Sequence, residues 1–215
     1  MSNGDPIVFL LDDEPGVLTV LGRVLGANGF AVRAWTSASE FLNAHDARIP
    51  GCLIADVRMP QMSGLEVQRV LLARGIDRPI IFITQQGDVR TTVLGMKAGA
   101  FTFLVKPVQR GELIGAVREA ITKDATRRAH HRERADISAR LARLTARERE
   151  VLHLLTTGML NKQIAAELGA AEKTIKTHRK RILEKMDVRT ATALVGLLYR
   201  GTSQRVAVQP QPHAA

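Results

Sequence analysis

The strongest constraint on the fold of this chain is a set of four short apolar runs, each followed by a polar residue. The runs IVFLL, CLIA, IIFI and FTFLV precede Asp12, Asp56, Thr84 and Lys106. Short apolar runs separated by helix-length segments are typical of buried parallel strands. Residues 6–122 hold five such strand-then-helix units, and right-handed crossovers between them predict an α/β fold with a doubly wound, five-stranded parallel sheet.

The polar residues that follow these runs are expected to meet at one edge of the sheet. In an open α/β sheet the binding crevice lies at the carboxyl ends of the strands. Asp12, Asp13 and Asp56 can hold Mg2+, which prefers oxygen ligands, and an aspartate can accept a phosphoryl group as an acyl phosphate. Lys106 and the Thr84 hydroxyl can bind the phosphoryl oxygens. Each residue alone is common at a strand end, but the five together indicate a phosphoryl site.

Residues 5–122 resemble a response-regulator receiver domain, which has a flavodoxin-like fold. The matching stretches are FLLDDEP, LIADVRMPQMSGLEV, IIFITQQGDV and MKAGAFTFLVKP. The resemblance implies that Asp56 is the phosphoacceptor and that Asp13, Asp56 and the backbone carbonyl of Arg58 ligate Mg2+, with Asp12 acting through water.

The same resemblance implies a switch. Thr84 is then the switch hydroxyl, Phe103 is the rotating aromatic coupled to it, and the Lys106–Pro107 peptide bond is cis. One position departs from the receiver pattern, because relatives usually have a small residue directly after the switch threonine and this chain has Gln85. We expect its long side chain to slow the entry of a phosphodonor.

The sequence contains N-terminal capping signals for several of the expected helices. Ser37–Glu40, Ser63–Glu66 and Thr145–Glu148 have the spacing of capping boxes, in which a hydroxyl and a glutamate satisfy free amides reciprocally. Asp88 is the predicted N-cap of the fourth helix, and Asn161 is the predicted N-cap of a helix in the last third of the chain.

The charge of the chain is concentrated in its last third. Residues 1–122 hold 12 Lys or Arg and 12 Asp or Glu, out of 31 and 21 in the whole chain, so the net charge of +10 belongs entirely to residues 123–215. A neutral N-terminal part and a basic C-terminal part favour a signal-handling domain joined to a nucleic-acid-binding domain. A solubilising basic tail is the simpler reading, but the basic region also has strong apolar periodicity.

The basic part has three predicted segments. Residues 123–138 are a charged linker, which either extends the fifth helix or is loose. Residues 139–199 form a second, all-helical domain, and residues 200–215, rich in Gln, Pro and Ala, form a disordered tail. The domain boundaries that follow are 1–122, 123–138, 139–199 and 200–215.

Residues 144–198 resemble the LuxR-type helix-turn-helix of NarL/FixJ-family regulators, through LTAREREVLHLLTTGMLNKQIAAELGAAEKTIKTHRKRILEKM. By family position, Lys176, Thr177 and Lys180 are the expected base readers. Lys162 and either Arg179 or Arg181 are expected phosphate contacts.

Helical spacing supports this assignment independently. With Lys176 at zero and about 100° per residue, the side chains of Lys180, Lys173 and Thr177 fall within about 100° of it, while Ile175, Ile182 and Met186 lie on the opposite side. A basic face opposed to an apolar face suits one helix in a major groove. For Lys173 alone, a merely solvated face is an equal alternative. Relatives often have a serine N-cap where this chain has Ala171, so the start of this helix is expected to fray.

Both resemblances together predict a transcriptional regulator and not an enzyme. The implied partners are a sensor histidine kinase, double-stranded DNA, a second copy of the chain after phosphorylation, and RNA polymerase. The rivals are an orphan regulator that binds DNA without phosphorylation, an RNA-binding protein, and an aspartyl-phosphate phosphohydrolase. The phosphohydrolase is disfavoured because Arg58 stands where such enzymes place a second acid.

Composition limits the setting in which the chain works. No apolar run approaches the ~20 residues of a membrane span, and the start of the chain lacks a basic signal-peptide region, so a cytoplasmic location without a membrane is expected. The single cysteine, Cys52, lies in an apolar run and is expected to be a buried, inert thiol.

Overall fold

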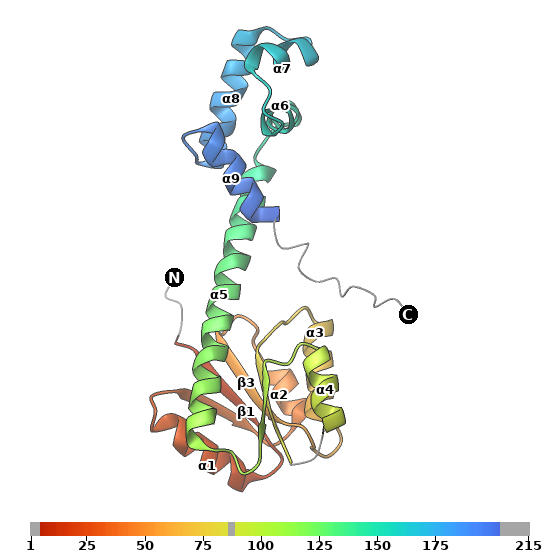
Figure 1. Ribbon diagram of the computed structural model, residues 1–215, viewed down its shortest axis with the longest axis vertical. Coiled ribbons are helices and arrows are strands. Elements are labelled where there is room, and N and C mark those ends of the chain that lie inside the picture. Colours follow the sequence, from red (N-terminus) through yellow and green to blue (C-terminus); the bar gives the residue numbers. More distant parts are fainter. Residues whose placement is uncertain (1–4, 86–88, 203–215) are drawn as a thin grey trace. The chain divides into compact units, whose positions relative to one another are not determined.

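The computed structural model describes residues 5–85 and 89–202 (Figure 1). These residues form two compact units that divide between Arg128 and Ala129. We call them the α/β unit and the helical unit. The predicted N-cap Asp88 and the predicted tail from residue 203 onward lie outside the described residues.

The α/β unit is a parallel sheet with helices on both faces. Its strands run in the order β2-β1-β3-β4-β5, as the predicted doubly wound sheet requires. The elements are β1 (Ile7–Leu11), α1 (Pro15–Gly26), β2 (Ala31–Trp35), α2 (Ala38–Ala44), β3 (Gly51–Asp56), α3 (Gly64–Ala73), β4 (Ile80–Thr84), α4 (Val89–Lys97), β5 (Thr102–Val105) and α5 (Arg110–Ala142).

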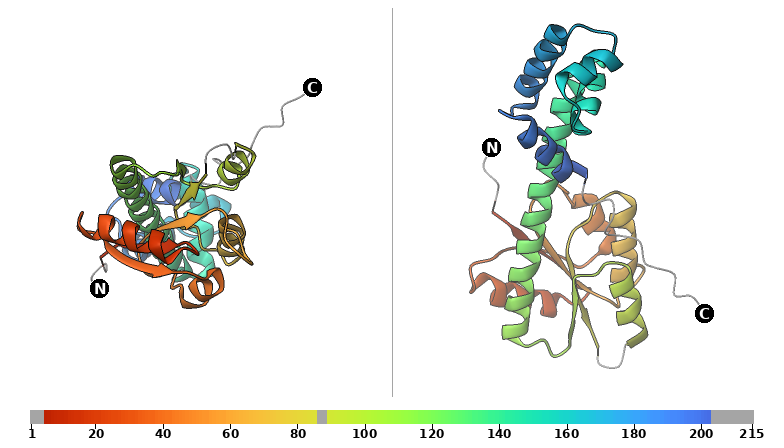
Figure 2. Two further views of the ribbon diagram at one scale, coloured as in Figure 1. Left: turned by 90° about the horizontal axis from the view of Figure 1, so that it is seen from below. Right: turned by 45° about the horizontal axis from the view of Figure 1, so that its top comes forward.

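Helices lie on both faces of the sheet (Figure 2), and alternation along the strands divides the core into two layers. Val8 and Leu10 of β1 point to the face that α1 and the first turns of α5 cover. Phe9 and Leu11 point to the opposite face, where they pack with side chains of α2 and α3. Because successive side chains of a strand point to opposite faces and helices cover both faces, the apolar runs of β1, β3 and β4 are buried on both sides.

The predicted helix starts are mostly observed. Ser63 and Thr145 form complete capping boxes, and the Ser37 hydroxyl accepts the Glu40 amide at 3.4 Å, which is one of the two bonds of its predicted box. The prediction for Asn161 is wrong. Asn161 is the first residue of its helix and Leu160 is the N-cap, since the Leu160 amide donates to the Gln163 side chain at 2.8 Å.

A buried carboxylate ties α5 to the amino ends of the strands. Asp124 is 1% exposed, and its side chain accepts hydrogen bonds from the Gly51 amide (2.9 Å), Arg127 (2.7 Å) and Arg128 (2.6 Å). Arg127 also pairs with Asp77, in the segment before β4, at 2.8 Å. Burial raises the pKa of Asp124, but these hydrogen bonds outweigh burial and the net pKa is lowered. We call these five residues the Asp124 cluster.

Arg78 extends the Asp124 cluster into the core. Arg128 donates to the Ile49 carbonyl at 2.9 Å, and the buried Arg78 donates to the same oxygen at 2.8 Å. The Arg78 guanidinium lies 4.4 Å from the centre of the Phe9 ring. Burial, followed by the charge of Arg78, lowers the pKa of the neighbouring His45 to about 4. The segment before β3 is therefore held by arginines rather than by regular secondary structure.

The helical unit packs four short helices around one core. They are α6 (Ala146–Thr156), α7 (Asn161–Glu167), α8 (Glu172–Met186) and α9 (Ala191–Thr202). The core is centred on Val151, Ile164, Ile175, Ile182 and Met186, each less than 1% exposed. Gly158 and Gly169 adopt the left-handed conformation at the ends of α6 and α7, where glycine is favoured.

Residues 123–138 are helical, because α5 continues through them to Ala142. Ala and Arg are the commonest residues of this stretch, and both are strong helix formers. Residues 129–136 are exposed, whereas Asp124 and Ile137 are buried in their respective units. The predicted domain boundaries at 122 and 139 stay predictions. No helix in the described ranges is long and apolar enough to cross a membrane.

Candidate functional site

Three carboxylates meet at the carboxyl edge of the sheet. Asp12 and Asp13 directly follow β1, and Asp56 ends β3, which pairs with β1. One carboxylate oxygen of each lies within 4.8 Å of the others. Asp12 is 2% and Asp56 9% exposed, while Asp13 is half-buried. Hard oxygen ligands at this spacing fit a divalent cation such as Mg2+.

Lys106 bridges two of these acids. Its Nζ lies 3.4 Å from Asp12 Oδ2 and 3.3 Å from Asp56 Oδ2. Burial lowers the pKa of Lys106, but the charges of Asp12 and Asp56 outweigh burial and the net pKa is raised. Burial raises the pKa of Asp12, against the opposing effects of the Glu14 amide, 2.9 Å from Asp12 Oδ1, and of Lys106. The ammonium group therefore stays charged beside the proposed phosphoacceptor.

Thr84 and Phe103 lie on the strands next to this group. Thr84 ends β4 and is 4% exposed, and its carbonyl accepts the Lys106 amide at 2.8 Å. Phe103 on β5 is aligned with Phe82 on β4, with ring centres 5.1 Å apart. The Lys106–Pro107 bond is cis, as the receiver resemblance implies. The structure thus brings Thr84, Lys106 and the acids to one edge, as predicted.

Two predicted contributors lie at the exposed rim. Arg58, whose backbone carbonyl is the expected third metal ligand, has an exposed side chain two residues after Asp56. Gln85, directly after Thr84, is also exposed. Its effect on phosphodonor entry stays a prediction.

Gly64 contributes to the site, although the sequence alone does not predict this role. A Cβ atom at this position would lie 2.3 Å from the carbonyl oxygen of Asp56 and 3.0 Å from the Phe82 ring. Glycine therefore lets the start of α3 approach the backbone of Asp56. The signal in the sequence is its place as the first residue after the Ser63 cap, but only the fold shows what it approaches.

The second candidate site is the exposed face of α8. Ile175, Ile182 and Met186 are buried in the core of the helical unit. The predicted contact residues are on the other side and are exposed, namely Lys173, Lys176, Thr177, Lys180 and Arg181, as is Lys162 on α7. The predicted separation of a basic face from an apolar face is therefore present in the structure.

The lysines of this face pair only weakly with their own helix. Lys176 lies 3.0 Å from Glu172 and Lys180 lies 3.8 Å from Glu184, with lysine side chains 62% and 79% exposed. Exposed pairs of this kind contribute about 0–1 kcal/mol, so DNA phosphates or bases can replace the glutamates at little cost. The Thr177 hydroxyl donates to the Lys173 carbonyl at 3.0 Å.

Arg179 differs from the other basic residues of α8. It is half-buried, and it donates to the Asn161 side chain at the start of α7 at 3.3 Å. This contact joins the two helices of the helix-turn-helix, so Arg181 is the better of the two predicted phosphate contacts. The N-cap of α8 is Ala171, whose side chain makes no cap bond.

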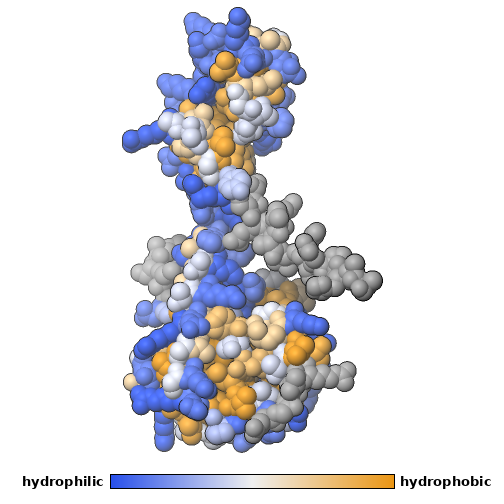
Figure 3. Space-filling view, in the orientation of Figure 1, coloured by the Kyte–Doolittle hydropathy of each residue, from blue (hydrophilic) through white to orange (hydrophobic). Residues whose placement is uncertain are grey.

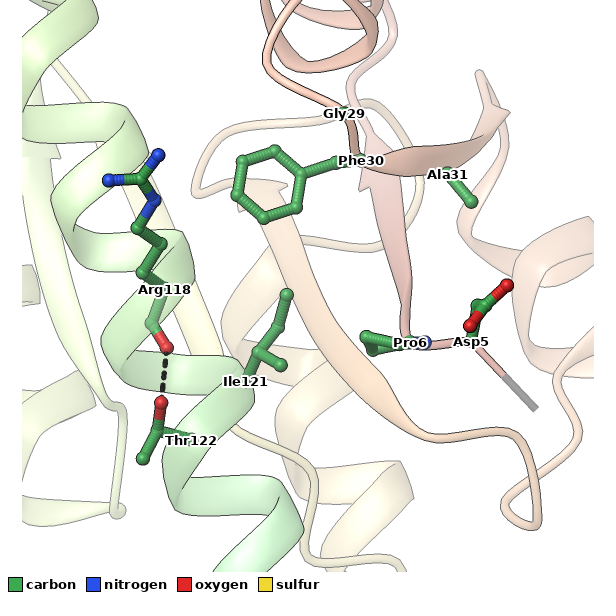
Figure 4. Close-up of a pocket in the computed structure, with 8 residues that line it drawn as sticks. All are labelled: Asp5, Pro6, Gly29, Phe30, Ala31, Arg118, Ile121 and Thr122. Carbon is green, nitrogen blue, oxygen red and sulfur yellow. Dashed lines mark hydrogen bonds between the residues drawn. The ribbon is translucent and has the colours of Figure 1, made fainter. Parts of the chain in front are cut away.

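A pocket of about 570 Å3 lies at the opposite end of the strands (Figure 4). Phe30 and Ile121 form its apolar walls, and Asp5 and Arg118 stand at its rim. None of the predicted site residues lines it. The chemistry therefore belongs to the carboxyl edge of the sheet and not to this pocket.

Comparison with known proteins finds two family matches. Residues 8–118 match the response regulator receiver domain, and residues 142–198 match the LuxR family of bacterial regulatory proteins. The response regulator protein TodT of Pseudomonas putida is 40% identical over 200 residues, which cover 93% of this chain and 88% of TodT. The transcriptional regulatory protein FixJ of Azorhizobium caulinodans is 38% identical over 188 residues, covering 87% of this chain and 89% of FixJ.

Solved structures agree with these relatives. The response regulator StyR is similar with a TM-score of 0.85 and 41% identity, covering 92% of this chain and all of that one. Full-length FixJ from B. japonicum is similar with a TM-score of 0.56 and 32% identity, covering 92% and 98% of the two chains.

Proposed function

Since the chain belongs to the NarL/FixJ-type response regulators, with a receiver domain and a LuxR-type DNA-binding domain, we propose that phosphorylation of Asp56 controls its binding to DNA. Its relatives are transcriptional regulators, and the chain is a regulator of this kind rather than an enzyme. A sensor histidine kinase is the proposed source of the phosphoryl group. The proposed binding to DNA supports a cytoplasmic location.

The proposed reaction is transfer of a phosphoryl group from a phosphohistidine. A carboxylate oxygen of Asp56 attacks phosphorus, the P–N bond breaks, and the departing imidazole takes up a proton, which leaves an acyl phosphate on Asp56. Lys106, 3.3 Å from Asp56 Oδ2, can donate a hydrogen bond to an oxygen of the arriving group. Thr84 is positioned at the end of the neighbouring strand to donate a second.

Asp12, Asp13, Asp56 and the Arg58 carbonyl are the residues that would hold Mg2+. The three carboxylates carry more negative charge than Lys106 can offset, so a bare site repels an anionic phosphodonor. The ion, when bound, neutralises charge on the acids and on the phosphoryl oxygens. The oxygen donors and their spacing of less than 4.8 Å fit such an ion.

The proposed response is a population shift in the face made by α4, β5 and α5. Phosphorylation draws Thr84 and Phe103 inward, which favours one of two receiver states. The surface of the α/β unit includes apolar areas (Figure 3), and α4 exposes Val93, Leu94 and Met96 at 46%, 54% and 49%. Val105 of β5 is 48% exposed. These side chains suit contact with a second copy of the chain.

Dimerisation would place two helical units on one operator with two half-sites. In each, α8 enters a major groove, where Lys176, Thr177 and Lys180 read bases and Lys173 lies alongside them. Lys162 and Arg181 contact phosphates. RNA polymerase is a further partner through which bound regulator would change transcription.

One observation carries this proposal: Lys106 lies within 3.4 Å of both Asp12 and Asp56 at the edge where β1 and β3 end. The test treats the full chain with acetyl phosphate and Mg2+ and measures acid-stable, base-labile label. We expect Asp56→Asn to abolish the label, because the nucleophilic oxygen is lost, and Asp77→Asn, which removes an exposed acid outside the site, to keep it. Full labelling of Asp56→Asn would refute the assignment of the phosphoacceptor.

A genome-wide DNA pull-down with and without acetyl phosphate tests the regulatory half of the proposal. We expect specific fragments whose recovery rises with the donor in the wild-type chain and not in Asp56→Asn. Equal recovery under all conditions would identify an orphan regulator instead. Competition by RNA at the same concentration would point to an RNA-binding protein.

A further inference from the structure

Gly95 of α4 lies directly against the ring of Phe103. A Cβ atom built on Gly95 would lie 2.4 Å from Phe103 Cζ, 3.0 Å from Cε2 of the same ring and 3.0 Å from Leu65 Cδ2. Carbon atoms in good contact are about 3.5–4.0 Å apart, so even one methyl group at this position collides with the ring. The ring therefore packs directly against the backbone of α4 at Gly95. We call this packing site, formed by Gly95 and Leu65, the seat of the ring.

The ring in this seat is also connected to the phosphoryl site. The ring of Phe103 packs at a tilt against Phe82 of β4, and Phe82 lies two residues before Thr84, on the same face of the sheet. Phe82 is aligned with Ala55, next to Asp56, and it is fully buried. Leu65, on the other side of the seat, belongs to the first turn of α3, which begins at the backbone of Asp56.

The seat has a consequence for α4. The exposed apolar residues of this helix lie beside Gly95: Leu94 and Met96 are its direct neighbours and Val93 is two residues away. If the ring moves away from Gly95, α4 loses this contact and its backbone can shift toward the sheet. While the ring stays, the contact prevents that shift. Ring orientation and helix position are thus two aspects of one packing arrangement, as expected for a well-packed and bistable core.

We propose that Gly95 is a positioning residue that sets the balance between the resting and activated receiver by seating the Phe103 ring. The inference rests on the proposed function, in which Thr84 and Phe103 respond to a phosphoryl group on Asp56. An added methyl displaces the ring from the orientation that it has in this structure. It therefore shifts the balance between two receiver states that differ in the position of this ring.

The test uses the full chain with fluorophenylalanine at position 103 and reads its fluorine resonance. Beryllofluoride with Mg2+, which mimics the acyl phosphate, is expected to shift this resonance in the wild-type chain. Gly95→Ala is expected to move the resonance without beryllofluoride. By linkage it should also change the affinity for beryllofluoride, on the order of 5-fold or more.

Two matched controls separate the ring contact from a general gain in helix propensity. Gly22 in α1 and Gly115 in α5 are also within helices, and a Cβ atom on either meets nothing within 4 Å. Gly22→Ala and Gly115→Ala should leave both the resonance and beryllofluoride affinity unchanged. Phe103→Leu removes the colliding ring, so Gly95→Ala should have no effect on beryllofluoride affinity in that background.

The outcomes are distinguishable. If the wild-type chain responds to beryllofluoride but Gly95→Ala matches it in resting resonance and affinity, the inference is overturned while the proposed function stands. An equal effect of Gly95→Ala in the Phe103→Leu background also overturns it. A wild-type chain that does not respond to beryllofluoride defeats the proposed function and the inference together. If Gly95→Ala unfolds the α/β unit, restored folding in the double variant supports the seat, and continued unfolding refutes it.

Discussion

The two units of this chain use charge in opposite ways. Of the seven buried polar or charged residues in the described parts of the chain, six belong to the α/β unit and only Glu148 belongs to the helical unit. The helical unit instead carries the charges proposed to contact DNA on exposed lysines and arginines of α7 and α8. Phosphoryl transfer needs fixed charges in a partly dry site, whereas DNA binding needs charges that can exchange their partners.

The difference predicts how each unit responds to loss of a charge. A charge that is buried among fixed partners is costly to remove, because its partners stay buried without it. An exposed charge contributes little to stability and can be removed with an effect on binding alone. The predictions below test this contrast, from the largest expected effect to the smallest.

Asp124→Asn is expected to have the largest effect on stability. Two arginines and the Gly51 amide would lose a charged acceptor that is 1% exposed. We expect a loss on the order of 3 kcal/mol in the α/β unit. Trp35, the only tryptophan, stacks on Phe9 at 6.0 Å in this unit, so its fluorescence during urea unfolding of the full chain reports on the α/β unit alone.

The pH dependence of this variant follows from the lowered pKa of Asp124. A carboxylate whose pKa is lower in the folded state stabilises the fold above its unfolded pKa, and this contribution disappears as pH falls through the folded pKa. The stability difference between the wild-type chain and Asp124→Asn should therefore be full above about pH 4 and shrink in stronger acid. A difference that is small and constant with pH would show that the cluster contributes little.

Lys176→Ala and Lys180→Ala are expected to change binding and not stability. Each should reduce discrimination between operator and random DNA by about 2 kcal/mol, the usual contribution of a good base contact. Lys162→Ala should weaken both kinds of DNA alike and flatten the salt dependence, since a phosphate contact carries no sequence information. Titration at several salt concentrations provides the measurement, and a uniform loss in all three variants would contradict base reading by α8.

Glu148→Gln tests the exception within the helical unit. Glu148 Oε2 lies 2.6 Å from Lys185, and this hydrogen bond, with those from Thr145, lowers the pKa of Glu148 despite burial. Lys185 is 29% exposed and can be hydrated when the charge is lost, so we expect a smaller loss of about 1–2 kcal/mol. Hydrogen exchange of α6 and α8 amides gives the value. A loss as large as that of Asp124→Asn would break the contrast between the units.

Ala171→Ser is expected to give the smallest effect, a gain. The first amides of α8 have no side-chain acceptor at Ala171, and a serine there should stabilise the helical unit by about 1 kcal/mol. Slower amide exchange in the first turn of α8, measured by mass spectrometry on the full chain, is the expected sign. Unchanged exchange there, with slower exchange elsewhere, would mean that the hydroxyl acts on another part of the chain.

The features that sequence could predict are those carried by local pattern. The apolar runs and the polar residues after them predict both the sheet and the meeting of Asp12, Asp13, Asp56, Thr84 and Lys106, because parallel strands end at one edge. The two faces of α8 follow from helical spacing alone. For residues 123–138 the sequence does not decide between a helix and a loose linker. Their composition favours a helix, but they lack the apolar stripe of a packed one.

The features that sequence could not predict depend on distant partners. Asp124 binds the Gly51 amide 73 residues away, and nothing near either residue indicates the other. Gly64 and Gly95 look like ordinary helical glycines until the fold places Asp56 and Phe103 against them. The N-cap prediction for Asn161 failed because the Gln163 side chain satisfies the Leu160 amide, which moves the helix start by one residue.

The Asp124 cluster decides where this chain can be cut. A receiver fragment that ends at residue 122, where the apolar pattern of α5 stops, would lack Asp124, Arg127 and Arg128 and would leave the Gly51 amide and the Ile49 carbonyl without these partners. A chimeric regulator joined at that point would inherit the same defect. Fragments and fusions should therefore keep the native chain through Arg128, so that modular exchange begins in the exposed residues that follow.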